Sequence, residues 1–395
     1  MSDSLSRSQL AVLVLALMAT GIGQSLVFAI LAPLGREVGM AEVQITSIIA
    51  TSALVFAVAS PRWGRLSDRI GRKPVIIIGL VGYTVGTLLF TSVFLGGLTG
   101  MLTGWLLYTV ALVARCGQSV IMSGTAPSAT AYAADCTSPQ RRTAAMASLG
   151  TANSLGMILG PAVSGALAAL GLLAPLYFAG VLSAAAAVLV WKALPALAVS
   201  ERRERSPRRM RYLDPRIRRY ALTAIALFTG FSAIQQTLGF QLQDKLQLDG
   251  VATAQMNGAA LMVSAMFTFL MQVTVMQRVK APPKVFIRTG LVLLGIGGLI
   301  VSVFGNFLTL AIGMTFFGSG LGLAMPAITA GASLAVPPEE QGAAAGVISS
   351  CPAVGFVTGP VVGGLLYPLS PSAPTVLGAA VFFVTVAALA LTGRR

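Results

Sequence analysis

Twelve long apolar runs, separated by charged or turn-forming residues, constrain this 395-residue chain more than any other feature. A helix needs about 20 apolar residues to cross the hydrocarbon core of a membrane. Only 10% of the residues are charged, whereas soluble proteins carry about 25%. The sequence therefore predicts an all-α polytopic membrane protein. The predicted spans are 10–34, 45–62, 75–95, 100–124, 142–168, 173–193, 220–242, 256–277, 285–304, 307–331, 341–367 and 374–392.

The 27 Lys and Arg residues are distributed unevenly along this topology. Nearly all of them fall on the side that carries Arg7 and Arg394, while the opposite loops hold only Arg36 and Lys245. Positive charge marks the cytoplasmic side of a membrane protein, so both termini are predicted to be cytoplasmic. Nucleic-acid binding is not expected, because it needs a basic face on a soluble domain.

An internal repeat divides the chain into two halves. At an offset of 199 residues, Pro127 and Pro139 fall on Pro326 and Pro338, and the Gly-Pro pair at 160–161 falls on the pair at 359–360. Six spans return the chain to its starting side, so the halves are predicted to be parallel-related six-helix bundles. Such repeats are typical of transporters that bind substrate at the midplane and rock one half against the other.

The predicted domains are a bundle over 1–193, a basic connector over 194–219 and a second bundle over 220–395. The cations of the connector could bind anionic headgroups, since each one near a membrane surface contributes about 1 kcal/mol. The alternative is that the connector is a topology anchor and a hinge strap.

The loop after the second span, residues 64–74, reads GRLSDRIGRKP and resembles the signature loop of the major facilitator superfamily. The resemblance covers the whole chain and implies a cytoplasmic latch, with the loop glycines allowing close backbone approach and a tight turn. Asp135 is expected to join this charge cluster together with Arg141 and Arg142, although a solvated ion pair is an equal alternative. The predicted gating residues are Gly64, Arg65, Asp68, Arg69, Gly71, Arg72, Lys73 and Asp135.

Two Gly-Pro segments resemble a pattern of the drug–proton antiporter exporters in that superfamily. Glycines four residues apart let helices pack closely, and proline bends a helix. Ser164 replaces one glycine of the pattern, and generic glycine packing is the alternative explanation. The predicted packing residues are Gly156, Gly160, Pro161, Gly165, Gly355, Gly359, Pro360, Gly363 and Gly364.

Arg115 lies inside the fourth span with Gln118 one turn further on. A charge within a span is costly and usually faces a cavity and a partner. The spacing resembles the R-x-x-Q-G of the superfamily's fourth helix, although Gly117 here precedes the glutamine. Arg115 could tune a proton site, act as counter-ion to an anionic substrate, or simply bind helix carbonyls. The predicted substrate contacts are Arg115, Gln118, Gln24, Asn153, Gln235 and Gln236, with interhelical hydrogen bonding as the alternative.

The chain has no His, three scattered Cys and no acidic residue in the middle of a span. These features predict no metal site, no cofactor and no enzymatic activity. Proton coupling is therefore implied by the resemblance alone, with Glu37, Asp244, Asp68 and Asp135 as rim candidates.

We expect a monomeric inner-membrane exporter of a small amphipathic compound, driven by a proton gradient. Its expected partners are that small molecule and the lipid bilayer. The alternatives are an exporter of an anionic metabolite or siderophore, with Arg115 as counter-ion, and an uncoupled facilitator.

Overall fold

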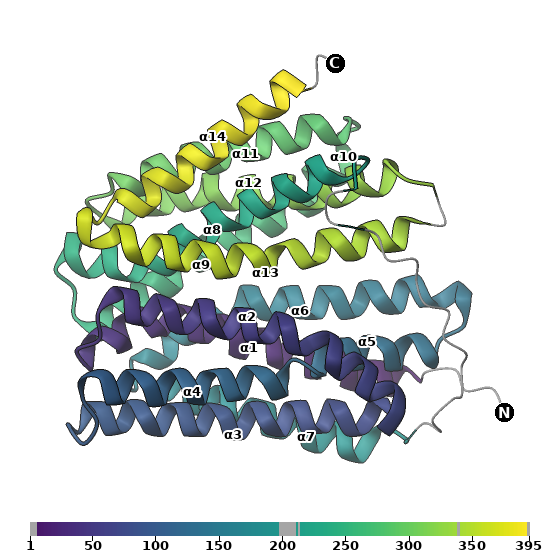
Figure 1. The fold of residues 1–395 in the computed structure, drawn as a ribbon, viewed down its shortest axis with the longest axis horizontal. Helices are drawn as coiled ribbons and strands as arrows, with labels where there is room; N and C mark the ends of the chain where they lie inside the picture. The colour runs from purple at the N-terminus through teal and green to yellow at the C-terminus, as the bar shows by residue number, and fades with distance from the viewer. Residues whose placement is uncertain (1–5, 197–210, 212–213, 338–339, 393–395) are drawn as a thin grey trace. The chain divides into compact units, whose positions relative to one another are not determined.

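The computed structural model describes residues 6–196, 211, 214–337 and 340–392. Within these ranges the regular secondary structure is helical and contains no strand, which confirms the predicted all-α fold (Figure 1). The helices are α1 (Arg7–Glu37), α2 (Glu42–Ile70), α3 (Arg72–Leu98), α4 (Gly104–Met122), α5 (Thr125–Asp135), α6 (Pro139–Ala168), α7 (Ala174–Ala193), α8 (Arg218–Leu246), α9 (Gly250–Val273), α10 (Val275–Arg278), α11 (Pro283–Ser302), α12 (Phe307–Leu334), α13 (Gln341–Leu366), the short 3-10 helix η2 (Tyr367–Leu369) and α14 (Ala373–Thr392).

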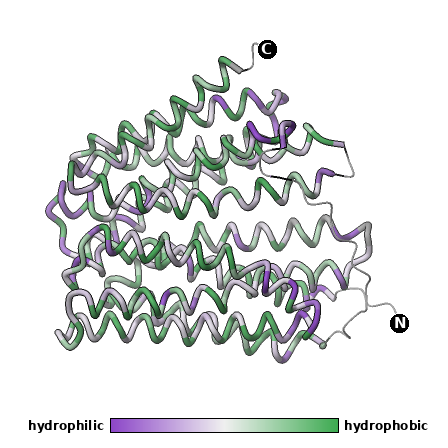
Figure 2. The backbone as a smooth tube through the Cα atoms, in the orientation of Figure 1, coloured by the Kyte–Doolittle hydropathy of each residue, from purple (hydrophilic) through white to green (hydrophobic). Residues whose placement is uncertain are grey.

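Eleven helical stretches in the described residues are long and apolar enough to cross a membrane. They account for eleven predicted spans, and α6 covers the remaining one, 142–168. Figure 2 shows hydrophobic residues along the helices and hydrophilic residues gathered toward helix ends and connecting loops. Most of the predicted connector, including Arg202, Arg203, Arg205, Arg208 and Arg209, lies outside the described residues.

The chain forms two compact units. Unit 1 comprises 1–41, 51–202 and 250–258, and unit 2 comprises 42–50, 203–249 and 259–395. The same neighbours recur in each: α1 packs on α6 and α3 on α4 in unit 1, while α8 packs on α13 and α11 on α12 in unit 2. Because helices in equivalent positions pack alike, the two units carry the repeat expected from the prolines and glycines.

The fourth predicted span, 100–124, begins four residues before the observed helical stretch and ends eleven residues before it does. A break at Ser123 and Gly124 separates α4 from α5, and the two together run from Gly104 to Asp135. At the break, the Gly124 N–H donates to the Ile121 carbonyl at 3.4 Å rather than to the carbonyl of Val120. Hydropathy alone missed α5 because Thr, Ser, Tyr and Asp make this segment less apolar than the runs before it.

Glycines on α3 let α4 and α5 approach closely in unit 1. A Cβ atom at Gly86 would lie 2.6 Å from the Gln118 side chain of α4, and one at Gly79 would overlap the Thr125 hydroxyl of α5. Small residues at such crossings let helix backbones come near enough for side chains to bond across them. This packing positions the polar residues of α4 against α3.

Candidate functional site

Arg115 and Gln118 form a buried pair in α4. Arg115 is 5% exposed and Gln118 is 2% exposed, and the Arg115 guanidinium donates to the Gln118 side-chain oxygen. The Gln118 amide then donates to the Thr87 hydroxyl at 2.5 Å and to the Tyr83 carbonyl at 3.2 Å. Both of those acceptors are in α3, so Gln118 joins the buried cation to the neighbouring helix.

The charge of Arg115 has no acidic partner within the described residues. Its contacts there are the Gln118 oxygen and the ring of Phe90, whose centroid lies 5.8 Å from the guanidinium carbon. A guanidinium has five N–H donors, and a buried cation without an anion is costly. The cluster is therefore suited to accept an anionic or strongly hydrogen-bonding group.

Tyr83 is a site residue that the sequence analysis missed. Its side chain is fully buried, and its hydroxyl makes no hydrogen bond within the described residues. The hydroxyl packs against Gly23 of α1, where a side-chain carbon would overlap it. An apolar span that contains one tyrosine, with Thr87 one turn further on, was the available signal.

The other predicted contacts of unit 1 are not bonded to the Arg115–Gln118 pair. Gln24 is partly buried in α1, and Asn153 is exposed in α6, with its backbone oxygen 2.7 Å from where a Cβ of Gly21 would lie. No hydrogen bond among the described residues joins either side chain to Arg115 or Gln118. The structure thus brings together two of the four residues predicted for this half.

In unit 2, α8 carries buried amides that lack partners. The Gln235 oxygen, the Gln236 nitrogen and both amide atoms of Gln241 have no hydrogen bond within the described residues. A buried polar group without a hydrogen bond is unfavourable, so these amides are available to bond to a ligand or to water. Gln235 and Gln236 were predicted contacts, whereas Gln241 was not.

An aromatic cluster lies one helical turn from Gln235. Phe231 of α8 stacks on Phe317 of α12, with ring centroids 5.3 Å apart, and meets Phe356 of α13 at 6.4 Å. Phe231 precedes Gln235 by four residues, so the two lie on one face of α8. Unit 2 therefore combines apolar rings with unpaired amides.

The two carboxylates predicted for the gate both pair with Arg72. Its guanidinium contacts Asp68 of α2 at 2.5 Å and Asp135 of α5 at 3.3 Å, and it donates to the Ser67 hydroxyl at 2.6 Å. Lys73 donates to the Trp191 carbonyl of α7 at 2.7 Å. This network ties the α2–α3 corner to α5 and α7 within unit 1.

Two details of this region differ from the sequence analysis. Asp135 pairs with Arg72 rather than with Arg141 or Arg142, because α5 ends beside the α2–α3 corner. Gly64 has open space beside it inside α2, so the expected close approach is not found there. Gly71 adopts a positive φ of 97°, in agreement with the tight turn expected at the loop glycines.

Arg65 and Arg69 are exposed and make no ion pair among the described residues. Of the loop arginines predicted for the gate, Arg72 is the one that pairs with Asp68 among the described residues.

The Gly-Pro helices pack through their glycines in both units. Methyl groups at Gly160 and Gly359 would overlap the hydroxyls of Ser25 in α1 and Ser232 in α8. Gly156 and Gly355 lie against the same two helices. A Cβ atom at Gly363 would lie 3.1 Å from the Thr237 side chain of α8. Ser164, the departure from the pattern, is buried and donates to the Leu26 carbonyl at 3.4 Å.

Two predicted packing glycines lie beside other helices of their units. Gly165 would meet Gln255 at 3.2 Å in unit 1, and a methyl group at Gly364 would overlap the Thr46 hydroxyl in unit 2. The same segment of each half therefore contacts two different helices.

Comparison with known proteins agrees with this arrangement. A family model described as Major Facilitator Superfamily matches residues 13–283 and 275–395. Multidrug resistance protein 2 of Bacillus subtilis (strain 168) is 28% identical over 357 residues, which cover 87% of this chain and 84% of that protein. The tetracycline resistance protein, class C, of Escherichia coli is 28% identical over 356 residues, covering 87% and 85%. The solved structure of the nucleoside transporter NupG matches with a TM-score of 0.77 and 12% identity, over 99% of this chain and 100% of that chain.

The fold and these matches define a multi-pass membrane transporter rather than an enzyme. More specifically, the chain belongs to the major facilitator superfamily, and it resembles relatives named for drug and tetracycline resistance.

Proposed function

We propose that this transporter exports a small amphipathic compound from the cell by alternating access, driven by the proton gradient. The names of the relatives support export, and they match over most of both chains. The observation that carries the proposal is the set of buried polar groups in apolar helices that have no hydrogen-bond partner among the described residues: the Tyr83 hydroxyl in the helix next to Arg115 in unit 1, and the α8 amides beside Phe231 in unit 2. Such groups suit a ligand that is apolar with a few polar atoms.

The second candidate is export of an anionic metabolite, with Arg115 as its counter-ion. The absence of an acidic partner for Arg115 within the described residues favours it. A planar guanidinium binds a carboxylate through two parallel hydrogen bonds, which a lysine cannot do.

Proton coupling is assigned to carboxylates at the helix ends. Asp68 and Asp135 share Arg72 in unit 1, and Asp244 of unit 2 accepts a hydrogen bond from the Tyr367 hydroxyl at 2.5 Å. Protonation of either partner of Arg72 would weaken the network, which links a proton to the gate. We place the protein as a monomer in the inner membrane with both termini cytoplasmic.

A thermal-stability screen tests the substrate class on purified protein. The probes are lipophilic cations, neutral drugs and carboxylate metabolites, compared in wild type and Arg115→Ala. A ligand at 100 times its Kd stabilises a protein by about 2.7 kcal/mol. Stabilisation by neutral or cationic amphiphiles that survives Arg115→Ala supports the first candidate. Stabilisation by carboxylates that disappears in the variant replaces it with the second.

Proteoliposome transport tests the driving force. Flux that follows an imposed pH gradient and stops when an ionophore collapses it is the expected result. Flux that persists unchanged after collapse makes the protein an uncoupled facilitator.

A further inference from the structure

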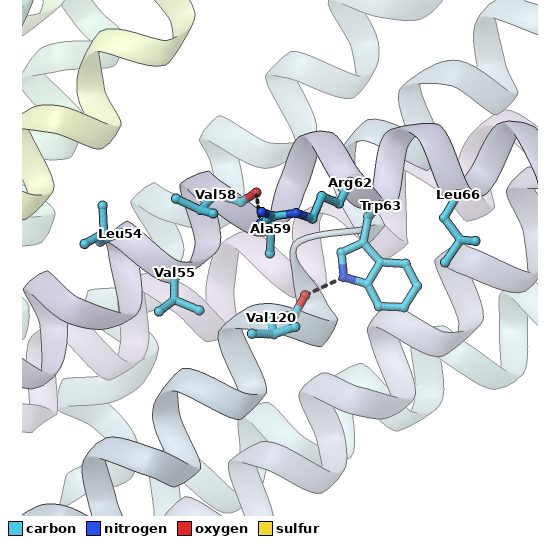
Figure 3. A pocket seen from close by; sticks show the side chains of 8 residues that line it. All are labelled: Leu54, Val55, Val58, Ala59, Arg62, Trp63, Leu66 and Val120. Carbon is cyan, nitrogen blue, oxygen red and sulfur yellow. Dashed lines mark hydrogen bonds between the residues drawn. The ribbon is translucent and has the colours of Figure 1, made fainter.

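An apolar cavity of about 510 Å³ opens beside α2 in unit 1, and no residue of the Arg115 cluster described above lines it (Figure 3). Leu54 and Val58 on its wall are 50% and 51% exposed, so the cavity is open on one side. Most of its lining side chains are apolar, which suits a hydrocarbon chain. The lining residues are Leu54, Val55, Val58, Ala59, Arg62, Trp63, Leu66 and Val120.

Trp63 shapes the end of this cavity nearest the helix break. Its indole N–H donates to the Val120 carbonyl at 2.6 Å, the carbonyl that the break between α4 and α5 leaves without its usual helical donor (Figure 3). Since the polar atom of the indole is bonded to α4, the part of the ring that lines the cavity is apolar. The cavity wall is thus held in shape by a contact between two helices.

A second cavity of about 220 Å³ shares Arg62 and Leu66 with the first and adds Arg65 and Arg69 to its lining. These three arginines recur at spacings of three and four residues and lie on one face of α2. None of them forms an ion pair with a described residue. Arg62 instead folds back and donates to the Val58 carbonyl at 3.2 Å. An apolar cavity therefore leads directly into a cationic one.

We propose that the two cavities together bind one anionic phospholipid of the surrounding membrane. An acyl chain fills the apolar cavity against Trp63, and the phosphate lies among Arg62, Arg65 and Arg69. Charge complementarity selects this occupant: a zwitterionic lipid would leave the three cations without net compensation, and inorganic phosphate would leave the apolar cavity unfilled. Clusters of cations beside membrane helices are known to recognise anionic headgroups.

The bound lipid would also support the packing of two helices. The lipid touches Trp63 and Val120 at once, so it supports the contact of α2 with α4 next to the helix break. This inference does not depend on which compound is transported.

Native mass spectrometry of the full-length protein tests headgroup selectivity. The purified, delipidated protein is titrated with phosphatidylglycerol and, separately, with phosphatidylcholine. Wild type is expected to retain phosphatidylglycerol at least tenfold more strongly. The triple variant Arg62→Gln, Arg65→Gln, Arg69→Gln should lose that preference. A control with the same charge change elsewhere, Arg141→Gln, Arg278→Gln, Lys280→Gln, should keep it. Equal phosphatidylglycerol binding by wild type and the first triple variant would overturn the proposal.

Fluorescence quenching tests where the acyl chain lies. The chain has three Trp residues, and the other two, Trp105 and Trp191, are 74% and 62% exposed, so Trp105→Phe and Trp191→Phe leave Trp63 as the only tryptophan, which is excited selectively over tyrosine. Phosphatidylglycerol with brominated acyl chains should quench Trp63 more than brominated phosphatidylcholine at equal mole fraction. Val58→Phe, which narrows the cavity while keeping all three arginines, should reduce this quenching. Equal quenching by both lipids, or no effect of Val58→Phe, would contradict a seated acyl chain.

Discussion

The Ser232 hydroxyl donates a hydrogen bond to the Gly355 carbonyl at 2.7 Å, and it occupies the space that a side chain at Gly359 would need. Ser25 makes the matching bond to the Gly156 carbonyl in the other unit, at 3.3 Å, beside Gly160. Each Gly-Pro helix is therefore fastened to the first helix of its own half by the same serine–glycine contact. Because Gly359 and Gly160 have no side chain, there is room for the serine hydroxyl, which bonds to a backbone carbonyl of the neighbouring helix.

Substituting these glycines should destabilise the protein far more than substituting others on the same helices. Gly160→Ala and Gly359→Ala insert a methyl group into a filled contact, and overpacking of this kind costs about 1–3 kcal/mol. Gly150 and Gly346 have open space around them on α6 and α13. Gly150→Ala and Gly346→Ala should be neutral or slightly stabilising, because alanine favours helix. Thermal unfolding in detergent compares the four, and similar midpoints for both pairs would refute the packing role.

Placing a carboxylate beside Arg115 should weaken the binding of anionic ligands there. Gln118→Glu places an acid where the structure has a neutral acceptor, so an anionic ligand no longer gains the whole charge of Arg115. Carboxylate affinity should fall at least tenfold, or about 1.4 kcal/mol, while the ligand-free protein becomes more stable. Thr87→Val, which removes the bond to Gln118 without altering charge, should largely keep the affinity. Unchanged carboxylate binding in Gln118→Glu would exclude Arg115 as the counter-ion.

The spans were predictable because each is a continuous apolar run that a bilayer requires. The pairing of Arg115 with Gln118 was equally accessible, since residues three apart on a helix are neighbours. The partner Thr87 was not, because it lies 31 residues away and reaches Gln118 only where Gly86 lets α3 approach α4. Contacts of that kind depend on tertiary packing.

The gate illustrates the same limit. The motif identified Asp68 and Arg72, which are four residues apart at a helix corner. It could not select Arg72 over Arg141 and Arg142 as the partner of Asp135, because that choice follows from the unforeseen helix α5, which carries Asp135 to the α2–α3 corner. The cavity beside Trp63 could not be predicted from the sequence either, because an apolar run does not show which of its side chains leave empty space after packing.

Neutralising Asp68 should impair transport more than stability. The Asp68 side chain is 57% exposed, and solvent-exposed ion pairs contribute at most about 1 kcal/mol. The free energy of unfolding of Asp68→Asn is therefore expected to lie within about 1 kcal/mol of the wild-type value. Its transport should be roughly tenfold slower, which corresponds to a rise of about 1.4 kcal/mol in the activation barrier. Asp135→Asn should behave alike, and Arg141→Gln should match wild type in both measurements. Full-rate transport by Asp68→Asn would remove the gate assignment.

The last expectation concerns pH and the segment before α8. Hydrogen bonds from the Arg216 side chain and backbone lower the pKa of Asp214 to about 2, and Arg216 also contacts Glu340 at 2.7 Å. A carboxylate whose folded pKa is depressed stabilises the protein above its unfolded pKa, about 3.9, and loses that effect as pH falls toward the folded value. The difference in unfolding midpoint between wild type and Asp214→Asn should therefore stay constant from pH 5 to pH 8 and shrink between roughly pH 4 and pH 2. Measuring both midpoints across that range checks the sign. A difference that changed between pH 6 and pH 8 would mean that another group titrates with Asp214 and would make this segment, rather than the Arg72 network, the place to look for the transported proton.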